Sequence, residues 1–369
     1  MDKIAIIGIG RLGLCLALNL EKVGYSVVGI DVSEEYVNAL KLKSLKSNEP
    51  LVNEYLNVSK NFEATTHFRT IFDSQIHIIF IVVPTPSLEN GEFSHAYIDE
   101  IINELEKYGK QKHTKHIIIN STCMPGYCDS IKNKLEDLNY TISYNPEFIA
   151  QGSIIKDQQY PDQVLIGSSS METGKLIENI YIKLCKSSPR YCHMSLISAE
   201  ITKLATNCFL TTKIAFANAI GDLAEITGAE FDKILDAVGA DSRIGNKYFK
   251  YGFGYGGPCF PRDNKAFVKF AANNNCSMLI SEATDKANNA HNDFLVHKWN
   301  MTFKKGEQII FDSITYKKGT DIIEESQQLK LAIDLAKDGH HVVIKESPIV
   351  IKKIMDIYSN LFTYQLHDN

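Results

Sequence analysis

The chain has 369 residues, of which 44% are hydrophobic and 22% are charged. This length and composition suit two or three globular domains with buried cores. The formal net charge is −5, so no overall positive field favours a nucleic-acid or anionic-membrane partner. No apolar run approaches the roughly 20 residues of a membrane-spanning helix, and the sequence therefore predicts no membrane partner.

The first elements form a βαβ pattern. A short apolar run at Lys3–Gly8 precedes helical periodicity over Leu12–Val23, and a second apolar run follows at Ser26–Ile30. Because the strand pattern begins at Lys3, we expect no signal peptide. The eight cysteines include no C-x-x-C pair and no zinc spacing, which favours a reduced, cytoplasmic setting and no metal site.

Apolar runs continue at Ile76–Val83, His116–Asn120 and Thr141–Tyr144, with a late strand near Val164–Gly167. Helical stretches lie between them, as in the doubly wound parallel sheets of α/β proteins. The sequence thus predicts an N-terminal Rossmann-type domain over residues 1–190.

A long helix is expected over Ser195–Gly228, followed by helical sequence to about Ala290. We therefore place a central helical domain at residues 191–300. Its long apolar face exceeds what one small domain can cover, which predicts a homodimer. A shortened α/β domain is expected at residues 301–369. Its predicted elements are a strand at Glu307–Ser313, a helix at Gln327–Asp338 and a strand at His341–Ile344.

Gly8, Gly10 and Gly13 form a G-x-G-x-x-G motif between the first strand and the first helix. In that context the glycines allow a tight turn, a close approach to a pyrophosphate and close packing of helix on sheet. Asp31 ends the second strand, where a carboxylate binds ribose hydroxyls and repels a 2′-phosphate. NAD is therefore the expected cofactor. The alternatives are ordinary turn glycines and a solvated Asp31.

The long helix carries Glu200, Lys203 and Asn207 on one face, opposite Ile201, Ala205 and Cys208. Such a polar stripe on a largely buried helix indicates a site, although a solvated face is the alternative. A second candidate is Cys259, which follows four nearby glycines and precedes Pro261, where a helix could begin. A helix N-terminus and Arg262 would favour its thiolate. The alternative is a buried structural cysteine beside a turn.

At this point the sequence resembles the UDP-glucose/GDP-mannose dehydrogenase family. The cysteine segment GFGYGGPCFPRD is similar to the family's catalytic loop, and six further motifs keep the family order over about residues 1–300. They are GIGRLG with Asp31, VPTP at Val83–Pro86, STCMPG at Ser121–Gly126, NPEFIAQG at Asn145–Gly152, AEITKLATN at Ala199–Asn207 and DSRIGNKY before the cysteine. Among the subfamilies, the sequences of these motifs most resemble those of the UDP-glucose 6-dehydrogenases.

The resemblance implies oxidation of a primary alcohol to a carboxylate through a thiohemiacetal and a thioester on Cys259. It implies that Lys203 stabilises oxyanions, that Asp263 and Thr122 position water, and that Glu147 is a general base, with Asn207 beside them. The implied cofactor contacts are Gly8, Gly10, Arg11, Leu12, Gly13, Asp31, Pro84, Thr85, Thr122 and Arg262. The implied substrate contacts are Phe148, Ile149, Gln151, Lys203, Asn207, Arg243, Tyr251, Gly256 and Lys317.

Two departures from the family pattern stand out. Gln151 replaces a glutamate and cannot take a proton from water. The C-terminal segment SITYKKGTDIIEES keeps only part of the family motif, in a domain about half the usual length. The favoured substrate is UDP-glucose, giving UDP-glucuronate. The alternatives are GDP-mannose or a UDP-N-acetylhexosamine, a two-electron hydroxyacid dehydrogenase, and a degenerate NAD-binding protein without activity.

Overall fold

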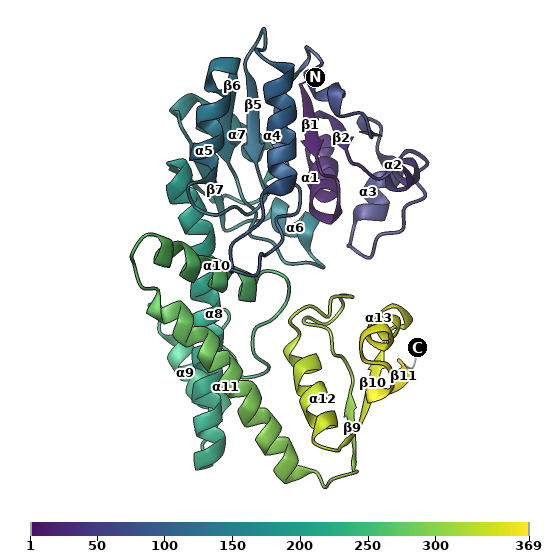
Figure 1. The fold of residues 1–369 in the computed structure, drawn as a ribbon, viewed down its shortest axis with the longest axis vertical. Helices are drawn as coiled ribbons and strands as arrows, with labels where there is room; N and C mark the ends of the chain where they lie inside the picture. Colours follow the sequence, from purple (N-terminus) through teal and green to yellow (C-terminus); the bar gives the residue numbers. More distant parts are fainter. Residues whose placement is uncertain (1, 368–369) are drawn as a thin grey trace. The chain divides into compact units, whose positions relative to one another are not determined.

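The computed structural model describes residues 2–367 (Figure 1). They form two compact units, divided after Lys203 within the longest helix, α8 (Leu196–Thr227). The predicted long helix is thereby confirmed almost to the residue. The division into domains at residues 190 and 300 stays a prediction.

The first unit is built on an eight-stranded sheet with the order β3-β2-β1-β4-β5-β6-β7-β8. The first six strands in this order are parallel, β7 is antiparallel to β6, and β8 is parallel to β7. The Rossmann-type prediction is confirmed, except that the sheet is not parallel throughout and that β3 and β8 were not predicted. The strands are β1 (Lys3–Ile7), β2 (Ser26–Ile30), β3 (Phe62–Thr65), β4 (Ile76–Ile81), β5 (Lys115–Ile119), β6 (Tyr140–Tyr144), β7 (Gln163–Ser168) and β8 (Arg190–Met194).

Helices cover both faces of this sheet because successive strand residues point to opposite sides. Ile4 and Ile6 of β1 belong to one apolar cluster, and Ala5 and Ile7 belong to the other. The first cluster includes residues of α1 (Arg11–Lys22), α2 (Glu34–Lys41), α3 (Val52–Val58), α6 (Ile154–Gln159) and α7 (Met171–Leu184). The second includes residues of η1 (Phe68–Phe72), α4 (Ala96–Tyr108), α5 (Tyr127–Leu135) and the start of α8, and a short η2 (Glu136–Leu138) follows α5.

The carboxyl ends of the parallel strands meet at one edge of the sheet, where ligands bind in folds of this kind. The backbone N–H of Gly8 donates to Ile30 beyond β1, and that of Val82 donates to Ile7. Asn120 and Asn145 continue the same row after β5 and β6. Several of the motifs found in the sequence therefore lie along one edge.

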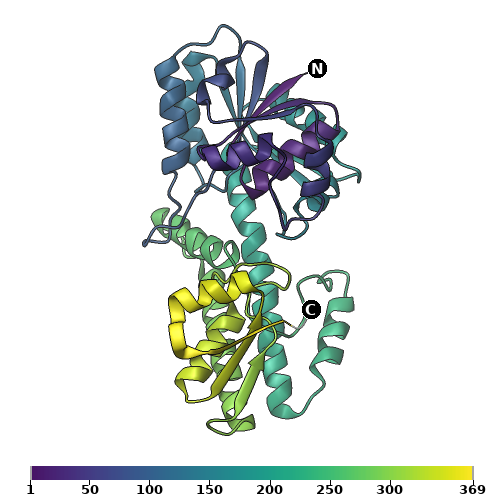
Figure 2. The same cartoon turned by 90° about the vertical axis from the view of Figure 1, so that its right-hand side faces the viewer.

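The second unit combines helices with a small parallel sheet of order β11-β10-β9. The helical part continues to Thr302, beyond the predicted end near Ala290, and β11 was not predicted. Figure 2 shows the small sheet in yellow tones with its helices beside it. Besides α8, the elements are α9 (Phe231–Ala240), α10 (Phe260–Asn273), α11 (Leu279–Thr302), β9 (Gln308–Phe311), α12 (Gln327–Lys337), β10 (His341–Glu346), α13 (Pro348–Tyr358), η3 (Ser359–Leu361) and β11 (Thr363–Leu366).

Among residues 2–367, no helix has the length and apolar character needed to cross a bilayer.

Candidate active site

The turn between β1 and α1 has the geometry that the glycine motif predicts. A Cβ on Gly8 would lie 2.4 Å from the carbonyl oxygen of Val82, and one on Gly13 would lie 2.0 Å from that of Gly8. A Cβ on Gly10 would have no described atom within 4 Å. Packing therefore demands glycine at the first and third positions, and the second leaves room beside the N-terminus of α1. That room suits the pyrophosphate of a dinucleotide.

Two loops at the same edge are joined by hydroxyl groups. Thr85 Oγ1 donates to the carbonyl oxygen of Thr122 at 2.7 Å, and Ser121 Oγ donates to that of Val83 at 2.7 Å. Pro84 lies exposed between them. Asp31 directly follows β2, and its Oδ1 accepts a hydrogen bond from the Ser33 N–H at 3.2 Å. These residues fit the cofactor that the sequence predicts.

Glu200 is fully buried, and its carboxylate holds the start of α5. It accepts hydrogen bonds from the N–H groups of Gly126 at 2.6 Å and Cys128 at 2.8 Å. Burial raises the pKa of Glu200, and the hydrogen bonds from the Cys128 and Gly126 N–H groups oppose that rise. The first member of the predicted polar face thus acts as a helix cap for the STCMPG segment.

Lys203, one turn further along α8, supports residues 145–152, here called the Glu147 loop. Its Nζ donates to the carbonyl oxygen of Glu147 at 2.6 Å and lies 4.5 Å from the ring centre of Phe148. Lys203 is buried. A buried ammonium with these contacts is well placed to stabilise negative charge near the loop.

The Glu147 carboxyl group lies in a network that can hold or release a proton. The Tyr181 hydroxyl is 3.1 Å from Glu147 Oε1 and 2.8 Å from Asn145 Oδ1, so one phenolic proton faces two acceptors. Burial raises the pKa of Glu147, while the Tyr181 hydrogen bond and the Lys203 charge oppose that rise. When protonated, Glu147 can donate to Tyr181, which then donates to Asn145. The arrangement accommodates both protonation states, as a general acid or base requires.

The end of the Glu147 loop is bound by side chains from distant positions. Arg11 Nη1 donates to Gln151 Oε1 at 2.5 Å, so the residue that replaces the family's glutamate contacts the glycine motif. Glu49 is buried and accepts hydrogen bonds from the N–H groups of Gly152 at 2.9 Å and Ile154 at 2.7 Å. Ile149 packs against the core of the sheet.

In the second unit, Cys259 is the N-cap residue of α10, and Pro261 lies in the first turn, as predicted. The Cys259 side chain is exposed, next to a helix end that favours negative charge. Asp263 is buried one turn later. Its Oδ2 accepts from Asn207 Nδ2 at 2.6 Å, and its Oδ1 lies 3.4 Å from Arg262 Nε. An exposed thiol thus precedes a carboxylate with a fixed orientation.

The remaining predicted substrate residues of this unit have varied surroundings. Tyr251 donates to Asp222 Oδ1 at 3.0 Å, and a Cβ on Gly256 would lie 2.1 Å from the carbonyl oxygen of Glu325. Arg243 is highly exposed and pairs with Asp241 at 2.6 Å. Lys317 is exposed on the loop after β9. The predicted roles of these residues in binding stay predictions.

Sequence reasoning missed several residues that support the Glu147 loop. Glu49, Asn120 and Tyr181 contact or support the Glu147 loop, and Asn120 Nδ2 donates to the carbonyl oxygen of Asn145 at 2.6 Å. Each lies at least 25 positions from its partner in the chain. No local spacing could have indicated these contacts.

The strand order of the first six strands, the glycine turn after β1 and the acid after β2 define a dinucleotide-binding protein of the Rossmann class. Residues 2–185 match the NAD binding domain of the UDP-glucose/GDP-mannose dehydrogenase family, and residues 197–290 match its central domain. The chain belongs to this family. The match confirms both the predicted family and NAD as the cofactor.

Individual relatives agree with this assignment. The chain is 31% identical over 302 residues to the UDP-glucose 6-dehydrogenase of Rickettsia felis, covering 80% of this chain and 66% of the relative. It is 31% identical over 301 residues to that of Rickettsia prowazekii, covering 80% and 69%. The solved structure of a UDP-glucose dehydrogenase from Pyrobaculum islandicum superposes with a TM-score of 0.88 at 26% identity, covering 99% of this chain and 86% of that one. The chain therefore spans about two thirds of the length of these curated relatives.

Proposed function

We propose that this protein is an NAD-dependent nucleotide-sugar 6-dehydrogenase that oxidises a primary alcohol to a carboxylate in two steps. The observation that carries the proposal is the arrangement at the start of α10. There an exposed cysteine occupies the N-cap position of the helix, and Asn207 donates a hydrogen bond to the buried carboxylate of Asp263 one turn later. A simple alcohol or hydroxyacid dehydrogenase has no need of such a nucleophile, whereas a four-electron oxidation must retain its aldehyde intermediate.

In the proposed reaction, Glu147 accepts the hydroxyl proton of the sugar while the first hydride leaves. The Cys259 thiolate then adds to the aldehyde carbon and gives a thiohemiacetal. Loss of the second hydride and of the hydroxyl proton converts this adduct to a thioester, and water cleaves the thioester to release the carboxylate, the thiolate and two protons. Bound NAD⁺ would supply the hydride acceptor in both oxidations.

The other residues have supporting tasks in this proposal. Lys203 stabilises the oxyanions that develop in the additions, because it is a buried cation. Asp263 and Thr122 position the hydrolytic water. Raising the pKa of Glu147 by burial brings this carboxyl group closer to the range in which a base works near neutral pH.

UDP-glucose is the proposed substrate, since the relatives described above are UDP-glucose dehydrogenases. We assign its contacts to Phe148, Ile149, Gln151, Arg243, Tyr251, Gly256 and Lys317. GDP-mannose is the main alternative because the family name includes it, and a UDP-N-acetylhexosamine is another. The sequence retains Cys259, Lys203 and Asp263. It also retains Glu147, whose carboxyl group is hydrogen-bonded to Tyr181. The presence of these residues argues against a degenerate protein without activity.

A panel of nucleotide sugars tests both the chemistry and the specificity. UDP-glucose, UDP-N-acetylglucosamine and GDP-mannose are each supplied in limiting amount, and NADH and uronate are measured at completion. We expect two NADH for each UDP-glucose consumed. A yield of one NADH per sugar would contradict the thioester mechanism, and turnover of another sugar alone would correct the substrate.

We further propose that the protein is a homodimer joined along α8. Phe209, Phe216, Leu223 and Ile226 are 54–72% exposed, and the first three recur every seven residues along one side of the helix. An exposed apolar row of this length usually marks an interface. Light scattering at micromolar concentration should give twice the monomer mass, and Leu223→Glu should reduce it to one. A monomeric wild-type protein would contradict the proposal.

A further inference from the structure

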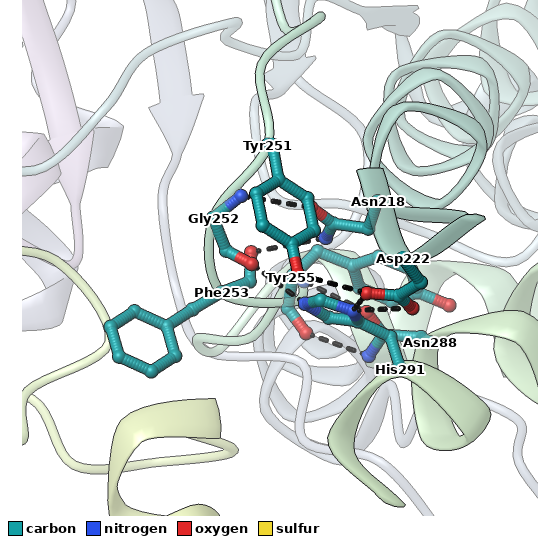
Figure 3. Close-up of polar contacts among 8 residues, drawn as sticks. All are labelled: Asn218, Asp222, Tyr251, Gly252, Phe253, Tyr255, Asn288 and His291. Atoms are coloured by element: carbon teal, nitrogen blue, oxygen red, sulfur yellow. Dashed lines mark hydrogen bonds and ion pairs between the residues drawn. The ribbon is translucent and has the colours of Figure 1, made fainter. Parts of the chain in front are cut away.

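A buried histidine of the second unit joins α11 to the backbone ahead of Cys259 (Figure 3). His291 is 2% exposed. Its Nδ1 lies 2.9 Å from each carboxylate oxygen of Asp222, and its Nε2 lies 2.6 Å from the carbonyl oxygen of Gly252. Figure 3 shows the imidazole between these two partners. Neither the sequence motifs nor the proposed reaction use this residue.

The protonation of this cluster follows from counting donors and acceptors. A backbone carbonyl oxygen can only accept, so Nε2 of His291 must carry a proton. Asp222 already accepts from the Tyr251 hydroxyl at 3.0 Å, which favours its carboxylate form. Nδ1 donates as well when Asp222 is a carboxylate. The contacts are then those of an imidazolium whose charge is balanced by Asp222 in a buried ion pair, and a protonated Asp222 that donates to Nδ1 of a neutral ring is the other arrangement that the distances allow.

The imidazolium is one of several contacts that hold a glycine-rich segment ahead of α10. Residues 252–259, here called the cysteine segment, contain four glycines and lead directly into α10. Asn218 accepts from the Gly252 N–H at 3.0 Å, and Asn288 accepts from the Tyr255 N–H at 2.9 Å and donates to its carbonyl oxygen at 3.0 Å. Figure 3 shows these amides and His291 along the same stretch of backbone. Among these side chains, histidine is the type whose charge changes near neutral pH.

The charged groups around His291 come from two helices and one loop. Asp222 and Glu225 project from α8, and Glu225 pairs with Lys298 of α11 at 2.9 Å. Burial and the Asp222 charge raise the pKa of Tyr251, so its hydroxyl stays a donor. The negative charge that faces the imidazole directly is thus Asp222.

We propose that His291 is a positioning residue. Its buried imidazolium links the Gly252 carbonyl oxygen to the Asp222 carboxylate by hydrogen bonds, and loss of its proton releases the cysteine segment. When the ring is neutral, one of its nitrogens must face an acceptor without a proton between them. The segment then opens more often, and Cys259 loses its fixed place at the start of α10. The consequence for turnover rests on the proposed function, whereas the hydrogen bond between His291 and Gly252 does not.

Hydrogen–deuterium exchange of the intact protein without substrate tests whether His291 holds the cysteine segment in place. We expect the amides of residues 252–257 to be protected at pH 6 and to exchange faster at high pH, after correction for intrinsic rates. The increase should be on the order of 10- to 100-fold, as expected for one hydrogen bond to a charged group. Peptides from β10, in the same unit, should show no such step. His291→Gln should show no pH step, because an amide side chain carries no titratable proton although it can still donate a hydrogen bond.

Nitrogen-15 spectra of labelled histidine provide a measurement that needs no variant. Two protonated ring nitrogens on His291 at pH 7 would support the proposal, and a neutral ring would overturn it. A pH step that persists in a folded His291→Gln protein, or the absence of a pH step in the wild type, would also overturn it. Because none of these readouts involves turnover, they are independent of whether the nucleotide-sugar assignment is correct.

Discussion

The Glu147 loop and the cysteine segment are immobilised by different means. Side chains reach the Glu147 loop from far along the chain, as Glu49 and Tyr181 do. The cysteine segment is also held by distant side chains, such as His291 and Asn288, but in addition it packs its own backbone closely, with Gly256 against the carbonyl of Glu325. The Glu147 loop should therefore be damaged when a side chain is removed, whereas the cysteine segment should also be damaged when a side chain is added. This difference sets what each substitution should do.

The largest effect is expected from Cys259→Ser. A serine hydroxyl stays protonated near neutral pH and is a far weaker nucleophile than a thiolate. Steady-state uronate formation should stop, with at most a small burst of NADH from the first oxidation. Cys276→Ser is the matched control, since Cys276 is the other exposed cysteine of the described chain. Normal uronate production by Cys259→Ser, measured by product chromatography, would refute the covalent mechanism.

Lys203→Ala should lower kcat by about 10²–10³, the usual cost of removing one preorganised donor to a developing oxyanion. The lysine also donates to the Glu147 carbonyl, so circular dichroism must show that the variant is folded. Lys175→Ala, on an exposed position of α7, serves as the control. If both variants turn over alike, Lys203 has no part in the chemistry.

Two glycines of the cysteine segment provide a direct comparison. Gly256→Ala would force a Cβ to within 2.1 Å of a backbone oxygen, and overpacking of this kind costs about 1–3 kcal/mol. Gly252→Ala meets no described atom within 4 Å and should be nearly neutral. Urea unfolding measures both. Equal stabilities would mean that backbone packing does not hold the segment.

Glu49→Ala removes a side chain that supports the Glu147 loop, instead of adding one. Removing this carboxylate leaves the Gly152 and Ile154 N–H groups without their acceptor, and we expect a loss of about 1–3 kcal/mol. The exposed Glu54 of α3 provides the control Glu54→Ala. A destabilisation no larger than that of the control would show that side-chain capping contributes little here.

The smallest expected effect is a shift in pH dependence from Tyr181→Phe. A base works when deprotonated, so activity should rise with pH through the pKa of Glu147, which burial raises. The Tyr181 hydrogen bond lowers that pKa, and losing it should move the acidic limb of kcat to higher pH. Tyr160→Phe, at an exposed position, should leave the limb unchanged. A shift to lower pH would contradict the donor role of Tyr181.

Local sequence patterns predicted the elements that carry a strong periodicity. The buried strands β1 and β2, the long helix α8 and the helix start at Cys259 follow from apolar runs, spacing and Pro261. The strands β3, β8 and β11 did not follow. Their sequences FEAT, RYCHM and TYQL carry polar or charged residues, because these strands lie at sheet edges with one side unpaired.

The family motifs identified both loops, but not what holds them. His291 and Gly252 are 39 positions apart, and Glu49 and Gly152 are 103 apart. Such contacts depend on tertiary packing, which leaves no periodic trace in one sequence. The antiparallel turn into β7 was likewise missed, because an apolar run has the same composition in either direction.

The small sheet of the second unit has a consequence for behaviour at high protein concentration. Its edge strands β9 and β11 have four residues each, and Ile310 and Leu366 on them are 45% and 60% exposed. Open edges with apolar side chains can recruit strands from other molecules, and short edges limit that tendency. Self-association through backbone pairing is therefore expected to begin here, and a lysine in place of Ile310 is the change that should delay it.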